Sequence, residues 1–344
     1  MNSSNLNTAV VVLNWNGIDF LQKFIPILIK NTSSDIADII VADNASTDNS
    51  VRFLQDNFPE VKLIILKENY GYAEGYNQAI AQLNHKYIVL INSDIEVSEN
   101  WLEPLVAQME SNPNIAACQP KIRDYKQKEF FEYAGAAGGY IDYLGYPFCR
   151  GRIFDSLEKD LGQYEDAKSI FWATGACIMV NTAIYKELGG LDGGFFAHME
   201  EIDLCWRIKS QAYEIYYVPN STVFHVGGGT LSKLNPKKTF LNFRNNLLLL
   251  YKNLPQKKLN KILFTRMILD GVAAVKFMVS FQFSHALAIL KAHFSFYKLL
   301  SQFKKKRKEN LEKAKTNTIK EIYPKSILKE YFIHKKDKFS LLEW

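Results

Sequence analysis

"AVVVLN", residues 9–14, is a continuous apolar run that ends on a polar residue. Three similar runs follow within the first hundred residues: "DIIVAD" (38–43), "KLIILK" (62–67) and "YIVLIN" (87–92). Continuous rather than alternating hydrophobicity is typical of strands that are buried on both faces. Helical patterns separate the runs, so the spacing predicts βαβ units and a mostly parallel sheet with flanking helices, an α/β fold.

The pattern changes in the second half of the chain. "SIFWATGACIMVN" (169–181) and "YEIYYVPNSTVFH" (213–225) indicate longer strands, and a helical region is expected to run to about residue 315. The stretch 259–300 is apolar, but three charged residues interrupt its best window and argue against a membrane span: Arg266, Asp270 and Lys276. An amphipathic helical unit that lies on the main domain or on a bilayer surface fits this stretch better.

Composition indicates an ordinary globular protein. The 344 residues are 47% hydrophobic and 23% charged, which excludes wholesale disorder. The four cysteines are far apart and form no CxxC pair, which argues against a zinc knuckle or a disulfide framework: Cys118, Cys149, Cys177 and Cys205. The N-terminus has no basic segment and only a short apolar run, so neither a signal peptide nor a span is expected there. These features predict a cytoplasmic protein.

The net charge of +6 is unevenly distributed. "KKLNKILFTR", "FKKKRK" and "HKKDKF" all follow residue 256, and such clusters attract anionic partners. No nucleic-acid recognition motif accompanies them, so nucleic acid is not an expected partner. Two alternatives remain open: peripheral contact with the inner face of an anionic cytoplasmic membrane, or a packing appendage with solvated lysines.

Polar residues follow the strands at the edge where α/β sheets bind ligands. Asp43, in "VADNASTDNS", could hold a ribose, but the turn after the first strand has only Gly17, which disfavours NAD binding. The plainer interpretation is a polar turn in which Ser46 or Asp48 caps the next helix. Capping of that kind leaves Asp43 free to contact a ligand.

"INSDIEV" ends the fourth strand with Asn92 and Asp94, two residues apart. Oxygen ligands there suit Mg²⁺ or Mn²⁺ held together with phosphates, although Asn-Ser-Asp is also common turn chemistry. His225 ends another strand and is followed, after one valine, by three glycines that allow backbone to approach a phosphate closely. In "KENYGYAEGYNQAI", Asn69 and Asn77 bracket a loop that opens a helix, where free N–H groups can meet an anion.

"FFAHMEEIDLCWR" (195–207) places three carboxylates beside residues that look like core: Glu200, Glu201 and Asp203. Asp203 and Arg207 are spaced i,i+4 and are expected to form a structural ion pair on a helix. Four apolar residues are expected to anchor the segment: Phe195, Phe196, Leu204 and Trp206. The two glutamates at the start of this helix are then expected to face a cleft.

Together these motifs resemble glycosyltransferase family 2, most closely its bacterial rhamnosyltransferase-like subset. The ordered set runs over roughly residues 8–255: "VVVLNWNG", "VADNASTDNS", "ENYGYAEGYNQAI", "LINSDIEV", "TGACIMV", "GGLDGGFFAHMEEIDLCWR", "VFHVGGGT" and "FRNNLLLLYKNLP". The resemblance implies a Rossmann-like GT-A fold over 1–240, with a nucleotide-binding half at about 8–100 and an acceptor-binding half at about 101–240. Residues 241–344 are then a C-terminal helical, basic region.

The resemblance also implies roles for individual residues. Asp43 matches the acid that reads the base, and the nucleotide site is lined by Asn14, Asn16, Asn69, Gly71, Asn77 and Ser93. Asp94 matches the metal-binding acid and His225 completes the Mg²⁺ or Mn²⁺ site, whereas Asn92 replaces the first acid of the motif. Trp172 and Gly175 match the loop between acceptor and donor sugar. Glu201 stands where many relatives have the aspartate base, with Glu200 as the second choice.

The implied activity is that of an inverting, metal-dependent glycosyltransferase. It would move a sugar from a nucleotide-diphospho-sugar, dTDP-rhamnose or a UDP-sugar, to a hydroxyl of a glycan or lipid-linked acceptor in cell-surface polysaccharide synthesis. The alternative is a catalytically inactive scaffold that binds nucleotide sugars at the membrane. The sequence leaves open the sugar, the acceptor, the linkage, the oligomeric state and which glutamate is the base.

Overall fold

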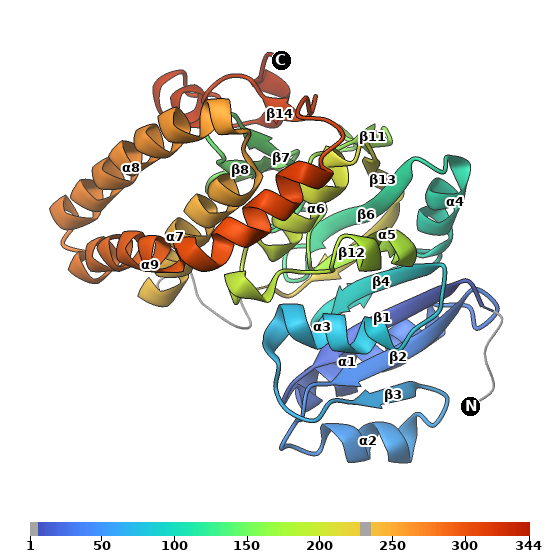
Figure 1. The fold of residues 1–344 in the computed structure, drawn as a ribbon. Coiled ribbons are helices and arrows are strands. Elements are labelled where there is room, and N and C mark those ends of the chain that lie inside the picture. Colours follow the sequence, from blue (N-terminus) through green and yellow to red (C-terminus); the bar gives the residue numbers. More distant parts are fainter. Residues whose placement is uncertain (1–5, 228–234) are drawn as a thin grey trace.

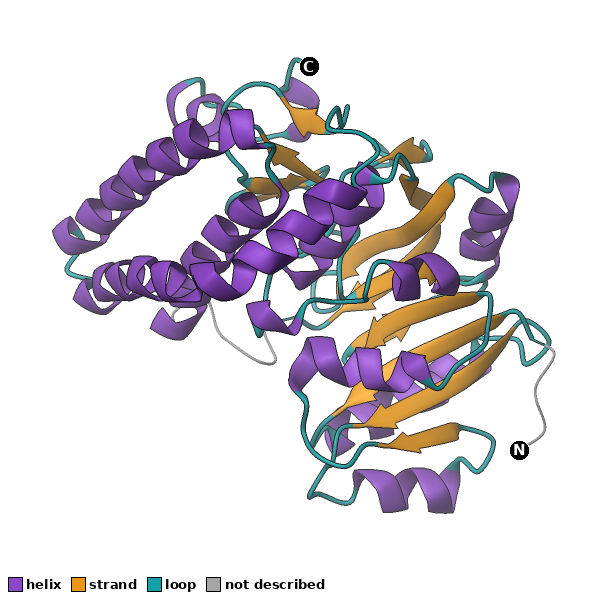
Figure 2. Ribbon diagram, in the orientation of Figure 1, coloured by secondary structure: helices purple, strands orange, loops and turns teal. Residues whose placement is uncertain are grey.

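The computed structural model describes residues 6–227 and 235–344. Figure 1 shows a sheet with helices on both faces, next to a separate layer of long C-terminal helices. Figure 2 shows the same division by secondary structure. The strand order of the nine-stranded sheet is β11-β13-β6-β12-β4-β1-β2-β3, and β5 pairs with β13.

The N-terminal strands are parallel, as the continuous apolar runs predict. They are β1 (Thr8–Asn14), β2 (Ala37–Asp43), β3 (Lys62–Ile65) and β4 (Tyr87–Asn92). The crossovers between them are the helices α1 (Ile18–Lys30), α2 (Ser50–Asn57) and α3 (Gly71–Ala81). All four strands therefore end at the same edge of the sheet, where the polar residues Asn14, Asp43 and Asn92 lie.

The second half of the sheet is mixed rather than parallel. Its strands are β5 (Ile95–Val97), β6 (Ile115–Asp124), β11 (Lys168–Ser169), β12 (Cys177–Asn181) and β13 (Glu214–His225). β12 is antiparallel to both β4 and β6, whereas β13 is parallel to β6. The helices of this half are α4 (Glu103–Ser111), α5 (Thr182–Glu187), the short η1 (Gly193–Phe195) and α6 (Glu200–Ser210).

Alternate residues of the central strands enter different cores. Val11 and Leu90 pack on the side of α3, α5 and α6, whereas Val10 and Val89 pack on the side of α1, α2 and α4. Both faces of the sheet are covered, which explains why the strands read as unbroken apolar runs.

The C-terminal layer consists of α7 (Pro236–Asn253), α8 (Gln256–Val279) and α9 (Phe283–Lys313). α7 begins with a proline, and the Asn235 side chain caps it by accepting the Lys237 N–H at 2.9 Å. None of the helices within the described ranges is long and apolar enough to cross a membrane.

A small second sheet connects the two layers. Its strands are β7 (Gly139–Asp142), β8 (Pro147–Cys149), β9 (Arg152–Ile153), β10 (Ser156–Leu157) and β14 (Ile322–Tyr323). β14 belongs to the tail beyond α9, which also contains the short helices η2 (Lys329–Ile333) and η3 (Phe339–Leu341). The Phe339 and Trp344 rings each lie 5.0 Å from the Tyr140 ring, so aromatic packing fastens the tail to this sheet.

Candidate active site

The ends of β1 and β2 form one hydrogen-bonded unit. Asn14 Nδ2 donates to Asp43 Oδ2 at 3.0 Å and to Ser46 Oγ at 3.2 Å, and Asp43 Oδ1 accepts the Ser46 N–H at 2.8 Å. Asn14 and Asp43 are both buried. Asn14 Oδ1 has no hydrogen-bond partner among the described residues, so it remains an acceptor at this edge.

Asn16 joins the loops that follow β1 and β2. It has a positive φ of 49°, and its Oδ1 accepts the Thr47 N–H at 2.7 Å. Asp48 accepts the N–H groups of Ile18, at the start of α1, and Ser50, at the start of α2. Capping by Asp48 is therefore confirmed, whereas Ser46 binds Asn14 and Asn16 instead.

Asn44, which the sequence analysis did not single out, shapes the start of α3. Its Nδ2 donates to Asn69 Oδ1 and to the Gly71 carbonyl, both at 3.0 Å, and its Oδ1 accepts the Tyr70 N–H at 2.9 Å. Gly71 has a φ of +74°, a backbone conformation that a side chain would disfavour. Asn69 and Gly71 are thus held next to the end of β2, with the N-terminus of α3 at the same edge.

Asn77 lies further along the same helix. Six residues of α3 separate it from Gly71, about 9 Å at the helical rise. Its Oδ1 accepts from the Tyr185 hydroxyl at 2.7 Å, and its Nδ2 donates to the Leu191 carbonyl at 2.8 Å. In this structure Asn77 therefore ties α3 to the turn after α5.

Asp94, His225 and Glu132 form a buried cluster where β4 and β13 end. Asp94 Oδ1 lies 3.3 Å from His225 Nε2, and Glu132 Oε1 lies 3.4 Å from His225 Nδ1. Burial alone lowers the pKa of His225, but the hydrogen bonds and charges of the two carboxylates outweigh it and raise this pKa to about 10. Ser93 lies near the first turn, because a Cβ on Gly17 would be 3.9 Å from Ser93 Oγ.

Within this cluster, Asp94 offers a divalent cation a carboxylate oxygen, and His225 offers a ring nitrogen once its imidazole has lost its proton. Two ligands at about 2.1 Å from one octahedral ion, at right angles to each other, lie about 3 Å apart. The Asp94–His225 separation of 3.3 Å is close to that value, and both residues are almost fully buried. No group of three or more His, Cys, Asp or Glu side chains that could hold a metal ion occurs within residues 6–227 and 235–344.

Glu201 lies beside the loop that contains Gly175. A Cβ placed on Gly175 would be 3.7 Å from the Glu201 Cβ and 2.7 Å from the Tyr72 hydroxyl oxygen. The Tyr72 hydroxyl donates to the Gly175 carbonyl at 2.7 Å. Burial, with the negative charge of Glu200 and Glu201 among further causes, raises the pKa of Tyr72 well above its usual value, so this phenol shares their environment.

The two adjacent glutamates differ in their surroundings. Burial raises the pKa of Glu201, which is partly exposed, to about 6. Glu200 is buried, its Oε2 has no partner among the described residues, and burial together with the charge of Glu201 raises its pKa well above the usual value. Near neutral pH, Glu201 is therefore the better proton acceptor of the two.

The backbone that leads into α6 is strained. Phe196, His198 and Met199 have positive φ values of 70°, 68° and 78°, a conformation that costs of order 1–3 kcal/mol at a non-glycine residue. Asn245 of α7 stabilises it, because its Nδ2 lies within 2.7–2.9 Å of the carbonyls of Phe195, Ala197 and His198. The buried Asn245 side chain, which belongs to the C-terminal helical layer, thus positions the start of α6.

The expected apolar anchors are confirmed with one exception. Phe195, Leu204 and Trp206 are buried, but Phe196 is 59% exposed. The expectation that Phe196 is a core residue was therefore wrong, because its left-handed backbone turns the ring outward.

The structural ion pair within α6 is confirmed. Arg207 Nε lies 2.8 Å from Asp203 Oδ2, and Asp203 is fully buried. Lys252 Nζ also contacts Asp203 Oδ2 at 2.8 Å, and Asn253 Nδ2 donates to its Oδ1 at 2.9 Å. Asp203 is thus bound by side chains of both α6 and α7. Its role is therefore structural, unlike that expected of the neighbouring glutamates.

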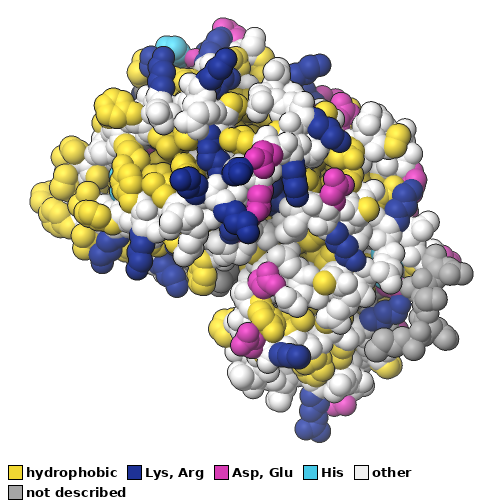
Figure 3. Space-filling view, viewed as in Figure 1, with side chains coloured by type: hydrophobic (Ala, Val, Ile, Leu, Met, Phe, Trp, Pro, Cys, Tyr) yellow, Lys and Arg dark blue, Asp and Glu magenta, His cyan; other side chains and the backbone are white. Residues whose placement is uncertain are grey.

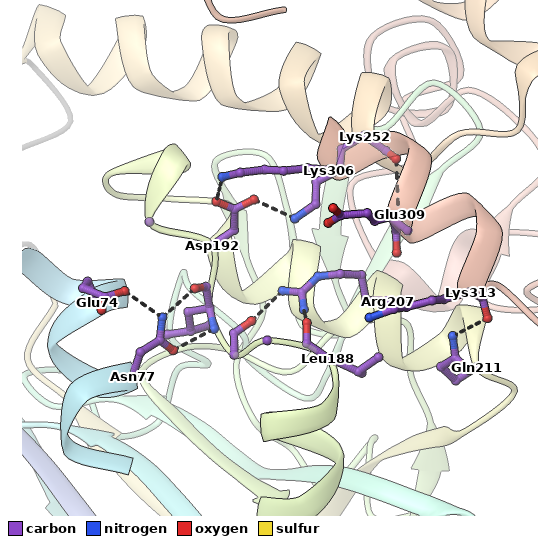
Figure 4. A pocket seen from close by; sticks show the side chains of 15 residues that line it. Glu74, Asn77, Leu188, Asp192, Arg207, Gln211, Lys252, Lys306, Glu309 and Lys313 are labelled. Carbon is purple, nitrogen blue, oxygen red and sulfur yellow. Dashed lines mark hydrogen bonds and ion pairs between the residues drawn. The ribbon is translucent and has the colours of Figure 1, made fainter. Parts of the chain in front are cut away.

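A cavity of about 300 Å³ opens beside this network (Figure 4). It lies between α3, the turn 188–193, α6 and α9, and Asp192 reaches across it to Lys252 and Lys306. None of the residues expected at the metal or at the base lines it. The cavity is therefore distinct from the sheet edge described above.

Trp172 and Gly175 occupy different environments. The Trp172 ring is 4% exposed, and its Nε1 donates to the Tyr140 carbonyl at 2.9 Å. A Cβ on Gly139 would lie 2.1 Å from this ring, so the indole packs directly on the small sheet. Of the two residues, the structure brings Gly175 next to Glu201 and keeps Trp172 in the core beneath.

Comparisons with known proteins agree with this architecture. The sequence is 25% identical over 234 residues to the N-acetylglucosaminyl-diphospho-decaprenol L-rhamnosyltransferase of Mycobacterium tuberculosis, covering 63% of this chain and 75% of that protein. It is 24% identical over 163 residues to the rhamnosyltransferase WbbL of Escherichia coli, covering 45% of this chain and 61% of that protein.

Solved structures show the same fold. The mannosyltransferase PcManGT from Pyrobaculum calidifontis, in complex with GDP-Man and Mn²⁺, superposes with a TM-score of 0.52 at 14% identity over 90% of this chain and 85% of that one. GalNAc-T7 with UDP, GalNAc and Mn²⁺ gives a TM-score of 0.56 at 16% identity over 73% of this chain, and the match spans about half (48%) of that protein.

The sequence profile of "Glycosyl transferase family 2" matches residues 9–189, more than half of the chain. The motifs, the GT-A sheet and the relatives point to the same family. The protein is a rhamnosyltransferase-like member of glycosyltransferase family 2.

Proposed function

We propose that the protein is an inverting, metal-dependent glycosyltransferase. It transfers a sugar from a nucleotide-diphospho-sugar, dTDP-rhamnose or a UDP-sugar, to a hydroxyl of a glycan or lipid-linked acceptor in cell-surface polysaccharide synthesis. The observation that carries the proposal is the position of Glu201, whose raised pKa suits a base, beside Gly175 in a GT-A fold that also holds the Asp94–His225 pair.

The nucleotide binds along the edge where β1, β2 and β4 end. Asp43 and Asn14 meet the base, and Asn16 holds the turn that carries them. Asn69, Gly71 and Ser93 line the path of the ribose and diphosphate, near the N-terminus of α3, whose free N–H groups favour an anion. Asn77 contributes from further along α3 by holding the turn that follows α5.

Asp94 and His225 would hold the divalent ion, Mn²⁺ or Mg²⁺, beside the donor diphosphate. A mixed oxygen and nitrogen set, together with the Mn²⁺ bound by GalNAc-T7 and PcManGT, favours manganese. The bound cation would neutralise charge on the diphosphate leaving group. Glu132 fixes the orientation of His225 from the opposite side of the ring.

Glu201 acts as the general base. Its carboxylate takes the proton of the acceptor hydroxyl while that oxygen bonds to the anomeric carbon. The bond from this carbon to the diphosphate oxygen breaks on the opposite face, so the configuration inverts and the nucleoside diphosphate leaves. Because burial keeps Glu200 protonated, this residue adds no second negative charge near the reacting atoms.

A base must also be placed accurately to act. Asn245 holds the segment before α6 in its strained conformation, and the Tyr72–Gly175 hydrogen bond fixes the facing loop. Trp172 supports that loop from the core. These residues position Glu201 without contacting the substrate.

Of the two kinds of acceptor, a lipid-linked glycan is favoured by one relative. That relative acts, by its name, on a diphospho-decaprenol carrier, which is a membrane lipid. Residues 1–240 then form the transferase domain, with nucleotide-binding and acceptor-binding halves, and the basic region 241–344 contacts the inner, cytoplasmic face of an anionic membrane. Because Asp94, Glu201 and His225 are all present, an inactive scaffold is the weaker alternative.

Thermal unfolding with a panel of dTDP-, UDP- and GDP-sugars, with and without Mn²⁺, tests donor and metal together. We expect one donor class to raise the melting temperature only when Mn²⁺ is present. Transfer from that donor to a polyprenyl-diphosphate-linked acceptor is then measured, and the anomeric configuration of the product is read by NMR. Absence of any metal-dependent stabilisation, or a product with retained configuration, would contradict the proposal.

A further inference from the structure

The α8–α9 hairpin carries an apolar face that the rest of the described chain leaves largely exposed. On α8 its residues recur every three or four positions: Phe264, Ile268, Val272, Val275 and Val279. On α9 they recur at the same intervals: Phe283, Leu287, Leu290, Phe294 and Tyr297. Each of these ten side chains is at least half exposed, and Phe281 in the connecting turn is 83% exposed. Together these eleven residues are called the hairpin face.

The hairpin does not need this face in order to fold. Different residues of the same helices, among them Leu259, Ile262, Phe296 and Phe303, are buried in the main core. Each helix therefore has two apolar stripes, and only one of them packs on the body of the protein. A surface helix normally has a single apolar stripe, so the second stripe requires a partner of its own.

The exposed apolar area is large. Ten side chains of this size, each at least half exposed, present on the order of 1,000 Å², above the roughly 300–600 Å² of the largest patch on a typical monomer. In Figure 3 hydrophobic side chains gather over α8, α9 and the free end of the hairpin, with Lys and Arg along the margins. The hairpin extends away from the sheet in Figure 1.

Charge determines which partner fits. From Gln256 to Lys308 the chain has twelve Lys and Arg residues and a single acid, Asp270. Asp270 is fully buried and lies next to Arg266 and His293, so within this segment no acidic side chain reaches the surface. A second copy of the chain would bring two positive surfaces together, whereas an anionic bilayer offers complementary charge and an apolar interior.

We propose that the hairpin face inserts into the interface of an anionic lipid bilayer, with α8 and α9 lying along the membrane plane. No described helix can span the membrane, so the contact is peripheral and one-sided. Lysines that flank the face, such as Lys276, Lys291 and Lys298, lie at the level of the lipid headgroups.

This contact also orients the site, a step that rests on the proposed function. Lys306 of α9 binds Asp192, which lies directly before η1. Lys252 of α7 binds the same Asp192 and also Asp203 of α6, the helix that carries Glu201. The hairpin is therefore linked to α6 through Asp192 and Lys252. Docking of the hairpin fixes the height of the base above the membrane, where the glycan of a lipid-linked acceptor begins.

The test is vesicle cosedimentation of the full chain. Vesicles of phosphatidylglycerol and phosphatidylcholine are compared with vesicles of phosphatidylcholine alone, at moderate salt. We expect binding to the anionic vesicles and weaker binding to the neutral ones. The double variant Val272→Glu/Phe294→Glu places a charge on each stripe without touching the core, and should weaken binding by roughly tenfold or more.

Leu161→Glu is the matched control. Leu161 is 82% exposed but lies outside the hairpin, and this variant should bind vesicles as the wild type does. Wild-type failure to bind vesicles of either composition, or unchanged binding by the double variant, would overturn the proposal. So would a dimer in light scattering that the double variant dissociates, because the face would then belong to a second copy.

Donor binding separates this inference from the proposed activity. Both variants should keep the melting-temperature rise with dTDP-rhamnose or a UDP-sugar and Mn²⁺, because neither change lies at the sheet edge. Vesicle binding without any donor response would contradict the proposed activity but not the membrane contact. A donor response without vesicle binding would contradict the membrane contact but not the proposed activity.

Discussion

Replacing Glu201 by glutamine separates its two effects, on catalysis and on stability. Glutamine has nearly the same shape but cannot take a proton. We expect transfer to fall by about 10²–10⁴-fold, the usual contribution of a general base, with donor affinity unchanged. In the wild type, kcat/KM should rise as the pH passes through about 6, because Glu201 must be ionised to act.

The same change should stabilise the fold. The ordinary pKa of a glutamate is 4.5, and burial raises that of Glu201 to about 6. Because the folded state holds this proton more tightly than the unfolded chain, ionisation of Glu201 destabilises the protein as the pH rises from about 4.5 to 6. At 1.36 kcal/mol per pH unit, the penalty above that window is about 2 kcal/mol. Glu201→Gln removes it.

Thermal unfolding of wild type and variant at about pH 7.5 and about pH 4.5 measures this effect. The variant should be more stable at the higher pH, and most of its advantage should disappear at the lower one. Glu200→Gln is the matched control: it mimics the protonated acid that burial favours, so activity should largely remain. Full transfer by Glu201→Gln with unchanged donor binding would refute the assignment, and an inactive Glu200→Gln beside it would move the role to Glu200.

Three further outcomes are expected. Asp94→Asn should abolish the Mn²⁺-dependent stabilisation by donor, about 2.7 kcal/mol at a hundredfold excess over Kd, in thermal unfolding; a retained metal response would exclude Asp94 as a ligand. Asn245→Ala should destabilise the fold by about 1–3 kcal/mol and lower kcat more than it changes the donor KM, because the carbonyls of Ala197 and His198 lose the Asn245 amide, whereas that of Phe195 keeps Arg244. Gly175→Ala should inactivate the enzyme, because its Cβ would lie 2.7 Å from the Tyr72 oxygen, and added Tyr72→Phe should restore part of the transfer; an equally inactive double variant would contradict this steric account.

The α/β class and the edge at which the parallel strands end could be predicted from the sequence. Continuous apolar runs are a local property, and parallel strands joined by helices bring their ends to one edge whatever the details of packing. Asp43 and Asn92 were placed there for that reason. The pairing of Asp203 with Arg207 was also predictable, because i,i+4 spacing fixes proximity within one helix.

Other parts of the candidate site depend on contacts between distant residues. Three contacts join residues that are far apart in the sequence: Asn44 with Asn69, Glu132 with His225, and Asn245 with the segment before α6. No periodicity in the chain connects these partners. Phe196 looked like core because its neighbours are aromatic, but a left-handed backbone turns it to solvent.

The α8–α9 hairpin shows most clearly what the sequence predicts and what only packing decides. Its sequence indicates amphipathic, basic helices, but both stripes of each helix are apolar and the sequence does not rank them. Packing of α8 and α9 against the body buries one stripe and leaves the other exposed. Composition and periodicity thus determined the elements and the edge of the sheet, whereas the tertiary structure decided which polar groups meet there and which apolar surface remains uncovered, because burial is a property of the assembled layers.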